Sequence, residues 1–101
     1  MKRLSLSLLA TFAFSPLLPA ADHVVYEPAG KAAGKHVVLL SGDEEYRSEE
    51  AMPMLGKILS QRHGFKCTVL FSLNDKGEID PGAGGSLTHP EALDSADAIV
   101  M

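Results

Sequence analysis

The sequence predicts an α/β protein with parallel strands, and three observations support this. An apolar run at residues 36–40 is followed by a segment with helical spacing, and a second strand-like run begins at residue 65. A third apolar run begins at residue 98, after a stretch long enough for one or two helical turns. Alternation of strand and helix favours a parallel sheet with right-handed crossovers. We therefore expect the order strand, helix, strand, short helix, strand.

The composition is that of a globular protein. Of the 101 residues, 46% are hydrophobic and 22% are charged, which argues against disorder. The net charge is −4 and the basic residues are scattered, so we expect no nucleic-acid partner. The single cysteine excludes an internal disulfide, and no Cys/His spacing typical of a structural zinc site is present.

Residues 1–21 have the pattern of an export signal. Two basic residues precede an apolar stretch at 4–14, and prolines and small residues follow it. We expect cleavage after Ala20 or Ala21, a periplasmic or extracellular location, and no stable membrane span after cleavage. An uncleaved membrane anchor is the alternative, but the prolines interrupt the apolar span.

The next segments predict the first half of the fold. Residues 22–35 form a polar lead-in that we expect to be extended and poorly ordered. Residues 36–40 are almost wholly apolar, without alternation, which is typical of a strand covered on both faces. Ser48 is the expected N-cap of the helix, and Gly64 is its expected stop.

The second half predicts two further strands. Residues 65–72 alternate as a strand, 74–90 form a long loop rich in Gly, Asp and Pro, and 91–96 suit a short helix. The third strand begins at residue 98. Three strands with one main helix cannot cover both faces of a parallel sheet, so we expect 36–101 to be the N-terminal portion of a longer, truncated domain.

The candidate site is the segment Ser41-Gly-Asp-Glu-Glu-Tyr-Arg-Ser48, between the first strand and the helix. Ligands in open α/β sheets bind at the carboxyl ends of the strands, and the helix begins at the same edge. Asp43 and Glu44 are the candidate catalytic residues, as a general acid or base or as oxygen ligands for a hard cation. The alternative is a solvated acidic turn.

Further side chains are candidates for ligand binding at this edge: Tyr46, Arg47, Ser48 and His89. Arg47 suits an anionic or hydroxyl-rich ligand, although pairing with a neighbouring carboxylate is an equal alternative. His89 belongs to the loop after the second strand, which can fold over the same edge. We expect His36 and His63 to lie at the opposite edge. Cys67 is not expected to be a nucleophile, because apolar surroundings raise the pKa of a thiol.

Three segments carry a resemblance to a known family: Lys35-His-Val-Val-Leu-Leu-Ser-Gly-Asp-Glu-Glu-Tyr-Arg-Ser-Glu-Glu-Ala-Met-Pro-Met-Leu-Gly-Lys-Ile-Leu59, Arg62-His-Gly-Phe65 and Leu93-Asp-Ser-Ala-Asp97. They resemble the N-terminal part of a ThuA-like (trehalose-utilisation) domain. The resemblance implies a flavodoxin-like three-layer sandwich related to class I glutamine amidotransferases, with a link to carbohydrate utilisation. Of the family's site residues, only those in the loop after the first strand can be assigned to this sequence. The resemblance implies that they line a cleft.

The leading functional hypothesis is an exported ThuA-like domain that binds or processes a carbohydrate-related small molecule. One alternative is a non-catalytic sugar-binding or interaction module of a larger exported protein. Another is an amidotransferase-like hydrolase whose nucleophile lies beyond Met101. The sequence assigns no cofactor, metal or oligomeric state.

Overall fold

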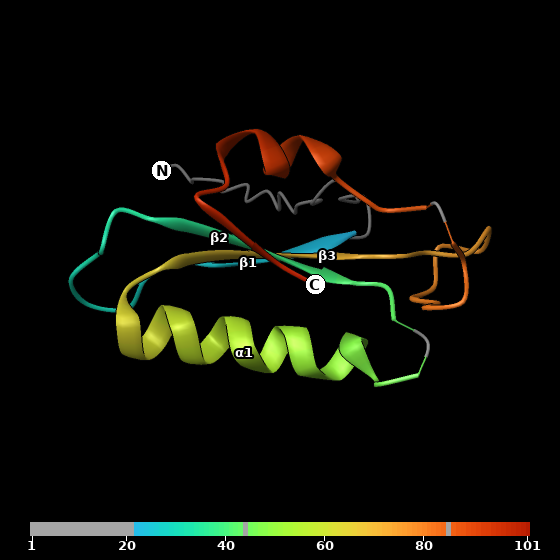
Figure 1. Cartoon of the computed structure of the whole chain (residues 1–101), viewed down its shortest axis with the longest axis horizontal. Coiled ribbons are helices and arrows are strands. Elements are labelled where there is room, and N and C mark those ends of the chain that lie inside the picture. Colours follow the sequence, from blue (N-terminus) through green and yellow to red (C-terminus); the bar gives the residue numbers. More distant parts are fainter. Residues whose placement is uncertain (1–21, 44, 85) are drawn as a thin grey trace, which may run out of the picture.

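A four-stranded sheet lies between one long helix and one short 3-10 helix (Figure 1). This is seen in a computed structural model, which describes residues 22–43, 45–84 and 86–101. The predicted export signal at 1–21 lies outside the described residues. The elements in chain order are β1 (His23–Tyr26), β2 (His36–Ser41), α1 (Ser48–His63), β3 (Lys66–Phe71), η1 (Pro90–Ser95) and β4 (Ala98–Val100).

The predicted α/β class and element order from residue 36 onward are confirmed. The sheet order is β1-β3-β2-β4, and β2 pairs in parallel with both β3 and β4. In the β2–β3 ladder, His36 lies opposite Lys66 and Ser41 lies opposite Phe71. The predicted short helix near residue 91 is the 3-10 helix η1.

The expectation of a purely parallel sheet is wrong, because β1 pairs antiparallel with β3. The lead-in at 22–35 is therefore not poorly ordered throughout. Its first residues, His-Val-Val-Tyr, are favourable in strands, and Val24 and Tyr26 pack against the α1-side core. A strand of four residues gives too little alternation for its period to be recognised in the sequence.

Two apolar clusters explain why β2 and β3 are almost continuously hydrophobic. On the α1 face, Leu39, Val69 and Phe71 belong to one buried cluster, which Leu55 and Leu59 of the helix cover. On the η1 face, Val38 and Leu70 pack with Ala92. Both faces of the two central strands are covered, as the sequence predicts for β2.

The start of α1 differs from the prediction. Arg47, rather than Ser48, is the N-cap; its backbone is left-handed, with φ 55°, and its side chain makes no capping hydrogen bond. Ser48 is instead the first helical residue and is buried. Its hydroxyl is used inside the preceding turn, as described below.

The carboxyl-terminal end of α1 is closed by Gly64 and by the loop between β1 and β2. Gly64 has φ 74°, and its N–H donates to the Leu59 carbonyl. The loop supplies two more donors: Ala29 N–H bonds the Ser60 carbonyl at 3.1 Å, and Ala33 N–H bonds the Gly64 carbonyl at 2.9 Å. The predicted helix stop at Gly64 is confirmed.

We predict that Gly64→Ala destabilises the protein much more than Gly34→Ala does. Both glycines are left-handed, with φ 74° and 76°, so each alanine costs about 1 kcal/mol of backbone strain. At Gly64 the new methyl group would also clash with the Lys31 carbonyl oxygen, whereas at Gly34 it meets no atom within 4 Å. Overpacking of this kind adds about 1–3 kcal/mol. Urea unfolding measures the difference; equal midpoints would contradict it.

Candidate functional site

A cleft of about 660 Å³ lies where β2 ends and α1 begins. Leu40, Met52 and Leu87 contribute apolar wall, and Asp43, Tyr46 and Ser48 contribute its polar groups. Three of the predicted site residues therefore line one cleft at the carboxyl edge of a parallel strand. A largely apolar cleft with a few fixed polar groups is the usual form of a small-molecule site.

A compact hydrogen-bonded turn holds Asp43 and Ser48 in place. The Asp43 carboxylate oxygen Oδ1 accepts from the N–H groups of Glu45, at 2.7 Å, and Tyr46, at 3.3 Å. The Asp43 N–H donates to Ser48 Oγ at 2.9 Å, and the Ser48 hydroxyl donates to the Asp43 carbonyl at 3.2 Å. The turn is thus ordered by its own side chains before any ligand binds.

Tyr46 and Arg47 follow this turn and have different surroundings. The Tyr46 side chain lines the cleft, and the residue is 76% exposed, so its ring is free to meet a ligand. Arg47 forms an ion pair with Glu50, one helical turn onward, and is not among the described residues that line the cleft. The predicted alternative for Arg47, pairing with a neighbouring carboxylate, is what the structure shows.

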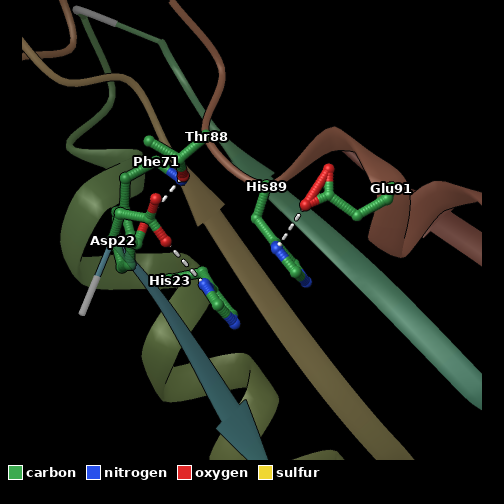
Figure 2. A network of polar contacts seen from close by, with 6 residues as sticks. All are labelled: Asp22, His23, Phe71, Thr88, His89 and Glu91. Carbon is green, nitrogen blue, oxygen red and sulfur yellow. Dashed lines mark hydrogen bonds and ion pairs between the residues drawn. The ribbon is translucent and has the colours of Figure 1, made fainter. Parts of the chain in front are cut away.

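His89 does not join Asp43 in the cleft. Its ring stacks on that of His23, with ring centroids 3.8 Å apart, and its Nδ1 lies 2.8 Å from Glu91 Oε1 (Figure 2). The loop after β3 therefore does not bring this residue into the cleft. The part of the loop that does reach the cleft is Leu87, an apolar residue that no sequence motif singled out.

Among the described residues, Asp43 and Tyr46 are the titratable side chains that line the cleft. Glu44 lies outside the described residues, so its catalytic role stays a prediction. Among the residues that the structure describes, no cluster of three or more His, Cys, Asp or Glu side chains could hold a metal ion. The hard-cation role of the Asp43 segment therefore has no support from the described side chains.

The residues expected to be structural have structural contacts. His36 Nε2 lies 2.7 Å from Thr68 Oγ1, and the His36 N–H donates to the Asp97 carboxylate at 2.7 Å. These bonds lie at the amino end of β2, away from the cleft. Cys67 is fully buried in the α1-side cluster, and burial raises the pKa of its thiol.

No family model, curated protein or solved structure matches this chain. The resemblance to ThuA-like domains therefore rests on the residues quoted above. Within the described part of the chain, none of the helices has the length and apolar character needed to cross a bilayer.

We predict that Cys67 is protected from thiol reagents in the native state. Only the thiolate reacts, and burial both raises the pKa of this thiol and blocks access to it. Iodoacetamide labelling of the folded chain should be roughly 100-fold slower than labelling of the urea-unfolded chain, because reaction requires opening of the sheet. Equal rates for the two states would show that Cys67 is accessible.

We predict that Asp22 makes the stability of the protein depend on pH in acid. Its hydrogen bond to His23, at 2.7 Å, and the nearby imidazole charge lower the pKa of its carboxyl below 3.8. A lowered folded-state pKa contributes stability above the unfolded-state pKa, and this contribution is lost as the pH falls through the folded-state value.

Urea midpoints measured from about pH 6 down to pH 2 test this linkage. At pH 6 the wild type should have a higher urea midpoint than Asp22→Asn. This difference in midpoint should shrink below pH 4. The exposed loop variant Asp75→Asn is the matched control. A difference for Asp22→Asn that stays constant with pH would contradict the linkage.

Proposed function

We propose that this chain is part of an exported ThuA-like domain with a flavodoxin-like sheet, and that it binds a carbohydrate-related small molecule in the cleft. The observation that carries the proposal is the pairing of an exposed aromatic ring, Tyr46, with a fixed carboxylate, Asp43, in one cleft. The position of the cleft, at the carboxyl end of β2, supports it. Export rests on the pattern of residues 1–21.

The chemistry of this pair suits a sugar. A sugar ring presents hydroxyl groups around its rim and C–H groups on its faces. A carboxylate accepts hydrogen bonds from hydroxyls, and an aromatic ring packs against an apolar face. Leu40, Met52 and Leu87 supply apolar surface in the same cleft as these polar groups. The described residues that line the cleft include no Lys or Arg, which favours a neutral ligand over an anionic one.

Binding without turnover is favoured over catalysis by one detail of the turn. Two backbone N–H groups already bond Asp43 Oδ1, so this carboxylate has a structural role as well as access to the cleft. A fixed acceptor of this kind orients a ligand. In an enzymatic version, Asp43 or Glu44 acts as the acid or base and needs a second catalytic group.

We predict that Asp43→Asn and Tyr46→Ala each weaken binding of a neutral sugar. The asparagine keeps an oxygen acceptor for the turn but removes the charge, and loss of a charge-assisted hydrogen bond lowers affinity by about tenfold or more. Loss of the ring costs roughly threefold to tenfold. Titration of the full ¹⁵N-labelled chain with trehalose, and separately with glucose, gives the affinities and the amides that shift.

Asp80→Asn is the matched control. Asp80 also accepts a backbone N–H through Oδ1, from Gly82 at 2.9 Å, but it is not among the described residues that line the cleft. It should leave sugar binding unchanged. The proposal is refuted if neither sugar shifts the amides of the 42–48 turn, or if the two cleft variants bind as the wild type does.

A further inference from the structure

A second pocket, of about 380 Å³, lies at the amino-terminal edge of the parallel strands. His36, the first residue of β2, and Ser95, the last residue of η1, both line it. The cleft lies where β2 ends, and a strand of this length spans about 16 Å. The pocket and the cleft are therefore separate places on the molecule.

The His36 ring contacts a different hydroxyl through each of its two nitrogens. Nδ1 lies 3.0 Å from Ser95 Oγ, and Nε2 lies 2.7 Å from Thr68 Oγ1. Thr68 belongs to β3 and is buried, whereas Ser95 is exposed. The ring thus joins a hydroxyl inside the protein to a hydroxyl that a solute can reach.

We assign the hydrogen of the neutral His36 ring to Nε2, on the basis of these contacts. The Ser95 carbonyl oxygen lies 3.3 Å from Nδ1, so the hydroxyl oxygen is the nearer partner of this nitrogen. In the assigned tautomer, Nε2–H donates to Thr68 Oγ1, and the lone pair of Nδ1 accepts the Ser95 O–H. The Ser95 hydroxyl is then placed to give its proton to the imidazole.

The backbone holds Ser95 and His36 side by side. The His36 N–H donates to the Asp97 carboxylate at 2.7 Å, and the Asp97 N–H donates to the His36 carbonyl at 2.7 Å. The Ala96 N–H, next to Ser95, donates to the Leu93 carbonyl at 3.3 Å and closes η1. The segment that carries Ser95 is thus bonded to the first residue of β2 on its carboxyl side and to its own helix on the other.

This arrangement is that of an activated nucleophile. A serine hydroxyl is a weak nucleophile unless a neighbouring base accepts its proton, and the base works best when a third group fixes its orientation. Ser95, His36 and Thr68 have these three relations to one another. Because the hydroxyl is exposed and lines a pocket, a substrate can approach it.

The charged residues of the pocket suit acyl transfer to an uncharged substrate. Lys66 lies opposite His36 in the β2–β3 ladder, which places its side chain on the same face, and Lys35 also lines the pocket. Positive charge near the reacting carbonyl stabilises the oxyanion that forms there. Glu27 and Asp97 line the pocket as well, so the formal charges of these four side chains cancel.

We propose that this pocket hydrolyses small, uncharged carboxylic esters, with Ser95 as nucleophile, His36 as general base and Thr68 as a positioning residue. Ser95 Oγ bonds to the ester carbonyl carbon while its proton passes to His36 Nδ1. The bond from that carbon to the alkoxy oxygen then breaks, and the alcohol leaves with the proton from Nδ1. Water attacks the acyl group next; its proton passes to Nδ1 and on to Ser95 Oγ as the carboxylic acid leaves.

The test applies two probes to the full chain. Turnover of p-nitrophenyl acetate measures hydrolysis, and mass spectrometry locates the adduct that a fluorophosphonate forms when a serine oxygen displaces fluoride. We expect the adduct on Ser95 of the wild type. Ser95→Ala should abolish the adduct and lower turnover by about 100-fold or more, and His36→Gln should slow both reactions by about 100-fold.

Ser86→Ala and His63→Gln are the matched controls. Neither residue is among the described residues that line this pocket, and each variant should react with both probes as the wild type does. Sugar binding in the cleft plays no part in either measurement, so this test and the test of the proposed function can fail separately.

Thr68 has a test that separates positioning from folding. Thr68→Val keeps the shape of the side chain but removes the acceptor for Nε2–H, so kcat should fall by about tenfold while KM stays the same. Thr68→Ser should restore kcat, because it returns the hydroxyl.

The decisive result is obtained on the wild type and does not depend on the folding of any variant. The proposal is overturned if the fluorophosphonate leaves Ser95 unmodified, or if it modifies Ser95 equally fast in the urea-unfolded chain. It is also overturned if Ser95→Ala hydrolyses p-nitrophenyl acetate as fast as the wild type does.

Discussion

The parallel pairing of β2 with β3 is the constraint on which the rest of the structure depends. It runs from His36 opposite Lys66 to Ser41 opposite Phe71 and leaves both strands covered on both faces. Because a parallel pair requires a crossover, α1 must return along the sheet and start where β2 ends. The turn at Asp43, the start of the helix and the cleft between them follow from this pairing.

Strong apolar runs and a clear helix stop made the fold from residue 36 onward predictable from the sequence. Residues 37–40 are apolar on both faces of the strand, and Gly64 ends a helix for a reason that is local to the chain. β1 was not predictable, because its four residues are half-buried at most and its partner is far away in sequence. Tertiary contacts decide the structure of such a segment.

The site residues that could be predicted are those that lie in one short turn whose position is fixed by the end of a strand. Asp43, Tyr46 and Ser48 come from one turn, and the end of β2 fixes where that turn lies. His89 depends on the path of a long loop, which is set by pairings such as Ser72 with Leu87. Those pairings leave no local pattern in the sequence. For the same reason the stack of His23 on His89 could not be foreseen.

The loop between β1 and β2 has a consequence for the long helix. The last carbonyls of any α-helix lack partners within the helix and must find donors elsewhere. Here the Ser60 carbonyl receives its donor from Ala29, in a segment that precedes the helix in the chain. The connection between two strands thus completes the hydrogen bonding at the far end of a helix that follows both strands in the chain. It couples the anchoring of the edge strand to the integrity of that helix end.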